Sequence, residues 1–431
     1  MLLNYRCVDE KATRRVPDIV PTVGRSSAPL AAAIDWAPRV RTLEGNSLRR
    51  AVELVSTTTG TSPVPSGGFA GALSRAVTAR LDPETLRLAR RRLHVKAIII
   101  GLWYATSFVG VVLASGWLEG VVAATSLALA FAAVGFNIQH DANHNAFFAA
   151  PTKRLSRANR IVGWSMFVVG ADANRWRYRH NTLHHGSPNV AGIDSDINLG
   201  PLARLAPTQR RYVWHRYQHL YLWPLYCFTV LEIMFNDLAT LVGASRHSRT
   251  SRSRLSEASV AVLTKVVFVV VMVGVPWLTH PIWIVAIGAL AVIFGVGLLL
   301  GVVFQSAHVV EGAEFAQVDA RPPYQWHEWQ VRSSLDFSHG SGPLSRLFRW
   351  YAGGLDHQTE HHLFPRVPHT AYPLIAPVVT AVCADYGIPR RVQPSFHAAV
   401  ASHFRHLRAM GQRPQPVQVV RSRTSTGAHG Q

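Results

Sequence analysis

The chain has 431 residues, of which 48% are hydrophobic, and it carries a formal net charge of +20. This apolar content excludes an intrinsically disordered protein, and three cysteines in so long a chain exclude a small disulfide-rich scaffold. A mean hydropathy of +0.12 together with a pI near 10.9 is unusual for a soluble enzyme and favours apolar residues concentrated in membrane spans.

The first 70 residues are rich in Pro, Ser, Thr and Arg and show no hydrophobic period. We predict a disordered cytoplasmic tail over 1–70, which lacks the basic-then-apolar pattern of a signal peptide. Residues 71–96 predict a helix with a strongly basic end. One membrane domain is expected over 71–412, followed by a second disordered tail over 413–431.

Four apolar runs of about 20 residues follow, over 97–117, 118–138, 258–278 and 282–304. A run of this length can cross a hydrocarbon core of about 30 Å, and short links pair the four runs into two hairpins. Lys and Arg flank the open ends of both hairpins, so the positive-inside rule places these ends and both termini in the cytoplasm. Because the basic charge then marks a membrane surface, we expect no nucleic-acid partner.

Three further segments predict helices that do not span. The run over 220–235 is too short and contains a proline and a glutamate, which favours an interfacial or re-entrant helix. The shorter run over 161–169 is expected on the membrane surface, and 394–410 shows the spacing of an amphipathic helix. With 139–257 and 305–431 forming a helical cytoplasmic cap, the predicted fold class is an all-α integral membrane protein of two transmembrane hairpins plus interfacial helices.

Many of the 21 histidines fall in three short clusters. The clusters read His140-Asp141-Ala142-Asn143-His144, His180-Asn181-Thr182-Leu183-His184-His185 and Gln358-Thr359-Glu360-His361-His362. Histidines four apart on a helix lie on one face, which applies to His140 with His144 and to His180 with His184. His185 lies about 100° further round the helix, where it can reach a second metal. Ordinary hydrogen-bonded histidines on the surface would explain one isolated pair. They do not explain seven histidines in three clusters beside a predicted span.

The number of clustered histidines bears on the metal. All-imidazole sites accept Zn, Cu, Fe or Ni, so the ligand type leaves the metal open. Seven histidines exceed what one tetrahedral zinc can use, so two metals are the economical interpretation.

The three clusters resemble the histidine boxes of the membrane fatty acid desaturases. HDANH, HNTLHH and QTEHHLFP carry the resemblance, which spans about residues 85–410. Gln358, in place of a histidine, is similar to the front-end subgroup, which includes Δ6-type and linoleoyl-CoA desaturases. A fused cytochrome b5 haem motif of the HPGG type is absent from the sequence.

The resemblance implies a non-haem diiron centre of two Fe ions at the cytoplasmic face. Its ligands would be His140, His144, His180, His184, His185, His361 and His362, together with His308 directly after the fourth span. Gln358 stands at a ligand position and would bind iron directly or through a water. Carboxylates beside ligating histidines commonly accept the other ring N–H, and we expect Asp141 and Glu360 in that role.

The resemblance also implies an O2-dependent reaction that places a cis double bond in a fatty acyl chain, carried as acyl-CoA or acyl-lipid. With no haem motif and no dinucleotide-binding fingerprint, the electrons would come from a separate ferredoxin or cytochrome b5-like donor with its reductase. We expect a multi-pass protein of a bacterial cytoplasmic membrane.

The remaining histidines receive structural roles. His215 and His219 are expected to be structural, His327, His339 and His357 are not expected to be ligands, and His403 and His406 are placed on the exposed face of the terminal helix. His369 is assigned no role.

Two other functions stay open. A lipid hydroxylase or ketolase shares the diiron scaffold and would add a hydroxyl rather than a double bond. A metal transporter or receptor would place its ligands on the spans near the bilayer midplane, whereas these clusters lie outside the spans.

Overall fold

The computed structural model describes residues 68–149, 152–238, 251–317, 324–337, 340 and 342–412. The predicted tail over 413–431 and nearly all of the tail over 1–70 lie outside these residues, as does His339. In the described part, helices predominate, and the one sheet is a two-residue parallel pairing of β1 (Val190–Ala191) with β2 (Ala316–Gln317).

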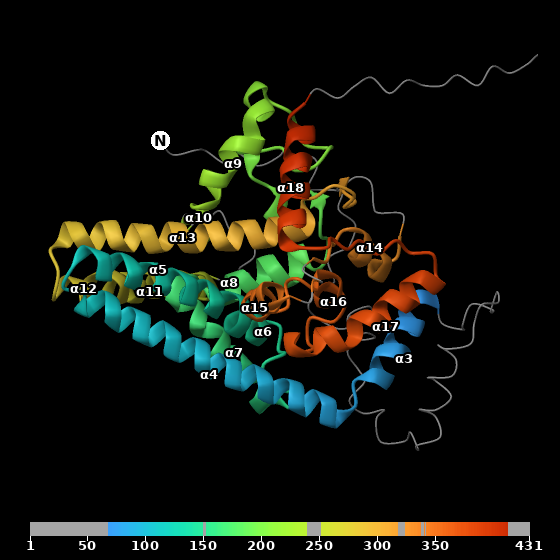
Figure 1. Ribbon diagram of the computed structural model, residues 1–431, viewed down its shortest axis with the longest axis horizontal. Helices are drawn as coiled ribbons and strands as arrows, with labels where there is room; N and C mark the ends of the chain where they lie inside the picture. Colours follow the sequence, from blue (N-terminus) through green and yellow to red (C-terminus); the bar gives the residue numbers. More distant parts are fainter. Residues whose placement is uncertain are drawn as a thin grey trace, which may run out of the picture.

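Among the described residues, four helices are long and apolar enough to cross a membrane, which confirms the predicted fold class. They are α4 (Pro83–Leu113), α5 (Trp117–Val134) with its continuation to Asn143, the helix over Leu255–Trp277, and α13 (Ile282–His308). The third begins in α11 (Ser251–Val269) and continues through η9 (Val270–Gly274) and α12 (Val275–Trp277). In Figure 1 the four run side by side toward the end of the molecule that carries both hairpin turns, and the short helices gather at the opposite end.

The first span and the basic segment before it form one continuous helix. Asp82 begins α4, because its carboxylate accepts a hydrogen bond from the Thr85 amide at 2.8 Å. The helix ends at Leu113, ahead of the boundary expected at 117. Glu119 accounts for the earlier turn, since its carboxylate accepts bonds from the amides of Ser115 and Gly116 and fixes the start of α5.

The cap consists of short helices and turns. The α-helices are α3 (Gly68–Arg80), α6 (His140–Asn143), α7 (Lys153–Gly163), α8 (Ala173–Arg177), α9 (Gln218–Tyr226), α10 (Thr229–Leu238), α14 (Trp326–Arg332), α15 (Pro343–Ala352), α16 (Gln358–Leu363), α17 (Tyr372–Asp385) and α18 (Phe396–Gly411). The 3-10 turns are η4 (Trp164–Val169), η6 (Ser195–Ile197), η7 (Gly200–Leu202), η8 (Val213–Tyr217) and η10 (His369–Ala371). The apolar segment over 220–235 forms α9 and α10, which pack against α13. Neither is among the helices that could cross a membrane.

Two π-helical segments occur at the first two histidine clusters. η3 (Gly135–Gln139) interrupts the second span directly before His140, and η5 (Tyr178–His184) carries the second cluster. Isolated π segments within helices are uncommon and often mark functional sites.

The terminal helix corrects one prediction. His403 and His406 are buried, not exposed, because α18 packs across α9 and the end of α13 (Figure 1). The His403 ring contacts the Val309 carbonyl and the Tyr226 hydroxyl, and His406 Nε2 lies 2.8 Å from the Leu205 carbonyl. These ring nitrogens hold α18 against the residue after the fourth span, against α9 and against the Leu205 segment.

Glycines in α13 allow α9 to approach closely. A Cβ on Gly297 would lie 2.2 Å from the Cys227 carbonyl oxygen, and one on Gly301 would lie 2.8 Å from the Tyr226 side chain. The pair forms a Gly-x-x-x-Gly pattern, the spacing that lets helices pack closely in membranes.

We predict that Gly297→Ala destabilises the protein by about 1–3 kcal/mol, because the added methyl forces the Cys227 backbone away. Thermal unfolding in mild detergent measures the loss. Gly288→Ala on the same helix is the matched control, since a Cβ there meets nothing within 4 Å. Equal unfolding temperatures for the two variants would contradict this account of the α9–α13 contact.

Candidate metal centre

The three histidine clusters converge in the interior of the cap. All seven clustered histidines are buried, and so is His308 at the end of α13. They reach the site from α6 and the turn after it, from η5, and from α16. Gly353 brings the third cluster close to the first, because its backbone is left-handed (φ 65°) and a Cβ there would lie 2.2 Å from the Phe136 carbonyl oxygen.

The ligand-type atoms form two principal groups. In the first group they lie within 4.8 Å of one another and belong to His140, His144, His180 and His361. In the second they belong to His184, His308 and His362. His185 lies between the groups, with its Nε2 3.2 Å from His180 Nε2 and its ring stacked on that of His362.

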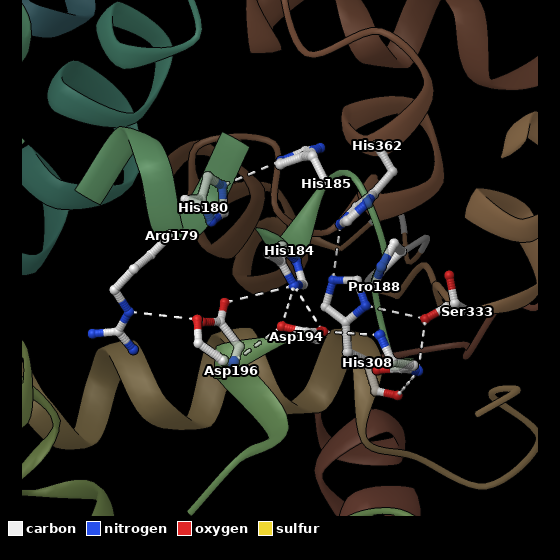
Figure 2. A network of polar contacts seen from close by, with 12 residues as sticks. Arg179, His180, His184, His185, Pro188, Asp194, Asp196, His308, Ser333 and His362 are labelled. Atoms are coloured by element: carbon white, nitrogen blue, oxygen red, sulfur yellow. Dashed lines mark hydrogen bonds and ion pairs between the residues drawn. The ribbon is translucent and has the colours of Figure 1, made fainter. Parts of the chain in front are cut away.

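Ring protons can be assigned in the second group. His308 Nδ1 lies 3.0 Å from the Ser333 carbonyl, which can only accept, so this nitrogen carries the proton. His362 Nδ1 donates to Gln330 Oε1 at 2.7 Å, and the Gln330 amide is oriented by its donation to the His185 carbonyl. The Nε2 atoms of His308 and His362 therefore both present lone pairs, yet they lie 3.0 Å apart (Figure 2). Two facing lone pairs form no hydrogen bond and require a cation between them.

The first group shows the same geometry. His140 Nε2 lies 3.3 Å from His180 Nε2, while the Nε2 atoms of His144 and His361 have no hydrogen-bond partner among the described residues. Imidazole nitrogens bind first-row metals such as zinc at about 2.1 Å, which puts neighbouring ligands roughly 3.0–3.4 Å apart. The observed N···N distances match this range, so the residues present fit two metal ions.

The pKa values of these histidines fit metal binding. Burial lowers the pKa of His144, His180 and His185 well below its usual range, so their rings are neutral at pH 7 and can bind a metal. His184 differs: burial opposes its charge, but the Asp194 and Asp196 carboxylates outweigh burial and raise its pKa to about 9. A metal ion on Nε2 would take the place of that proton.

The ring nitrogens of His184, His362 and His308 contact groups other than the predicted carboxylates. Asp194 lies 3.1 Å from His184 Nδ1 and also accepts bonds from the amides of Asn189 and Asp196. Gln330 and the Ser333 carbonyl perform the same task for His362 and His308. These residues lie 10–32 positions from their histidines, so little in the sequence links them to the clusters. Only Asp194 stands out, as a carboxylate near the second cluster.

Asp141 and Glu360 do not contact the histidines they were expected to orient. Asp141 Oδ2 lies 3.0 Å from Nδ1 of His369, the histidine assigned no role. Glu360 forms an ion pair with Arg390 at 2.9 Å and lies 3.5 Å from His357. Adjacent residues on a helix point in different directions, so closeness in sequence to a ligand does not bring a carboxylate to that ligand's ring.

The geometry around His185 also differs from the prediction. A π-helix bonds residues five apart, and the His185 amide donates to the His180 carbonyl at 2.9 Å. His180 and His185 therefore face each other, whereas His184 turns toward His308 and His362. An α-helix would have paired His180 with His184.

Gln358 points at the second group. Its amide nitrogen lies 2.7 Å from His308 Nε2, and its buried Oε1 has no hydrogen-bond partner among the described residues. The two ends of an amide are assigned from their surroundings, and rotating this one would direct the oxygen at the metal position.

A cavity opens onto the histidines from the side of α3. His144 and His185 line it together with apolar residues that include Val77, Leu81 and Leu363. The cavity thus reaches His144 of the first group and His185 between the two groups.

Comparison with known proteins decides the family. A family model described as fatty acid desaturase matches residues 115–394. The chain belongs to the fatty acid desaturase family.

Relatives within this family are named for their positional specificity. The chain is 32% identical over 352 residues to a sn-1 linoleoyl-lipid 6-desaturase of Synechocystis sp., covering 80% of this chain and 96% of the relative. A protein of the same name from Arthrospira platensis is 31% identical over 84% of this chain and 98% of its own length. An acyl-lipid (8-3)-desaturase of Physcomitrium patens is 31% identical over 73% of this chain and 65% of its own length. This fatty acid desaturase is therefore a front-end, Δ6-type member and a multi-pass membrane protein, as the histidine boxes predicted.

We predict that Gln330→Leu weakens metal binding about 10–100-fold. The leucine removes the acceptor of His362 Nδ1, so the His362 ring is no longer held in its orientation. Metal retained by the purified protein under increasing chelator, read by atomic mass spectrometry, measures the loss. Gln330→Glu keeps the acceptor and should retain metal. Equal retention by the leucine and glutamate variants would contradict the orienting role.

Proposed function

We propose that this desaturase introduces a cis double bond at carbon 6 of an acyl chain bound to a membrane lipid, with two irons and externally supplied electrons. The facing Nε2 lone pairs of His308 and His362 are the observation that carries the proposal. The names of the two cyanobacterial relatives, which match over nearly their full lengths, support the position and the lipid-bound substrate.

The proposed ligands divide between two iron positions. His140, His144, His180 and His361 would hold one iron, and His184, His308 and His362 the other. His185 lies between them, and Gln358 approaches the second position. Bound iron would supply the oxidising power of O2 that an unactivated C–H bond requires, since no general base can remove such a hydrogen.

The surrounding residues would prepare the site for this chemistry. Asp194, Gln330 and the Ser333 carbonyl keep the ring protons of three histidines on the nitrogens that face away from the metals. Two electrons from the donor and two from the substrate, with the matching protons, reduce O2 to two waters.

The electron donor is proposed to be a separate acidic carrier, a ferredoxin or a cytochrome b5-like protein. The cap carries exposed cations, among them Arg154, Arg157 and Arg216, which would steer an acidic partner. The same cations favour a cytoplasmic position of the cap and of both termini, in the cytoplasmic membrane of a bacterium.

The first experiment is expression in a host of known fatty-acid composition, with double bonds located by mass spectrometry. We expect a new double bond at carbon 6, and two irons per chain in the purified protein. His184→Ala and His361→Ala should each abolish the product, because each removes a proposed ligand. His397→Ala, an exposed histidine of α18, is the control and should keep activity. A hydroxylated product, or activity retained by either ligand variant, would contradict the assignment.

The second experiment tests the electron donor. With lipid substrate and O2 saturating, the desaturation rate at limiting reduced ferredoxin should fall steeply as ionic strength rises from 0.01 to 0.2 M, since added salt shortens the screening length from about 30 Å to below about 10 Å. A rate independent of ionic strength would exclude electrostatic steering.

A further inference from the structure

A pocket outside the metal centre lies where α4 meets α15 and the start of α17. Its apolar wall is Leu88, Val95 and Ile99 on one face of α4. Its opposite wall comes from Trp350 and from the segments around residues 354–357 and 369–373. Nothing in the proposed chemistry uses this pocket.

The pocket has an excess of positive charge. Arg91, Arg92, Lys96 and Arg349 line it, against the single carboxylate of Asp356, which leaves three positive charges. Among the described residues, Arg91 and Arg92 have no ion pair. Lys96 is buried, and its Nζ contacts only neutral groups closely: His369 Nε2 at 2.9 Å and the Trp350 ring at 5.2 Å. Cations that outnumber the carboxylates around them favour an anionic ligand, and arginine suits phosphate in particular.

The depth of the pocket matches the headgroup layer of a membrane. The apolar run of the first span begins directly after Lys96, and the α4 residues of the pocket wall are exposed. On α15, Leu344 and Leu347 are 70% and 62% exposed, as expected for a helix lying on the apolar part of the bilayer. The pocket therefore opens at the boundary between headgroups and acyl chains, where a bilayer lipid reaches it without leaving the membrane.

The inner wall of the pocket adjoins the metal centre. His357 immediately precedes Gln358, and His369 bonds to Asp141, the neighbour of His140. Within the described residues, neither carboxylate oxygen of the buried Asp356 accepts a hydrogen bond. A ligand with hydroxyl groups beside its phosphate would satisfy this carboxylate as well.

We propose that this pocket binds the phosphate-bearing headgroup of the membrane glycerolipid whose acyl chain is desaturated. This inference rests on the proposed function and adds the substrate class. A headgroup held here fixes the ester end of the chain beside the histidines, so the reacting carbon is counted from the carboxyl end. The pocket is thus a determinant of where the double bond forms.

The test uses the full-length, iron-loaded protein in detergent and three soluble probes: dihexanoyl phosphatidylglycerol, dihexanoylglycerol and hexanoyl-CoA. The pocket variant carries Arg91→Gln, Arg92→Gln and Arg349→Gln. The control variant carries Arg80→Gln, Arg87→Gln and Arg408→Gln, which removes the same charge from exposed sites outside the pocket. Calorimetry measures binding, and iron content and unfolding temperature confirm that both variants are folded.

The wild-type and control proteins should bind phosphatidylglycerol equally, and the pocket variant should bind it about tenfold or more weakly, the loss expected for charge-assisted hydrogen bonds. Dihexanoylglycerol, which lacks phosphate, should bind weakly and equally to all three. In the expression host, the pocket variant should also form double bonds at positions other than that of the wild type.

Three results would overturn the proposal. The first is that the pocket and control variants bind phosphatidylglycerol equally. The second is that the pocket variant forms its double bond at the same position as the wild type. The third is that loss of the three arginines weakens the binding of hexanoyl-CoA but not that of phosphatidylglycerol. Absence of any new double bond with the wild-type protein would instead overturn the proposed function, so the two failures are distinguishable.

Discussion

Facing lone pairs on buried imidazoles are the constraint on which this structure depends. The Nε2 atoms of His308 and His362 lie 3.0 Å apart with their protons on the opposite nitrogens, and burial has removed the water that would otherwise solvate them. A cation bound between these atoms would relieve the repulsion and the lost solvation. The acceptors behind each ring, such as Gln330, would then be as necessary to the site as the proposed ligands.

The backbone meets this constraint with uncommon local geometry. The π segment η5 brings His185 opposite His180 and turns His184 toward the second group, so one short stretch of chain supplies histidines to both groups. The fourth span adds His308 from its last residue, and α18 holds the following residue through His403. Two of the spans therefore end at the site, and the cap buries its histidines.

Two separate cavities lie on different sides of the cap. The cavity beside α3 opens directly onto His144 and His185, whereas the basic pocket on α4 opens at the headgroup level of the membrane. A lipid substrate is confined to the bilayer, and an electron carrier to the aqueous side. The proposed lipid headgroup and the proposed electron carrier would therefore meet different surfaces of the cap.

The sequence by itself determined the four spans, the three histidine clusters and the family, because apolar run length and histidine spacing are local properties that the neighbouring chain expresses directly. It also placed His308 at the end of the fourth span. Only the tertiary structure decided which rings face each other, that Asp194 and Gln330 rather than Asp141 and Glu360 orient them, and that His403 and His406 are buried. These contacts join residues far apart in the chain or depend on a π turn, and they form only when separate helices pack together, which no local pattern encodes.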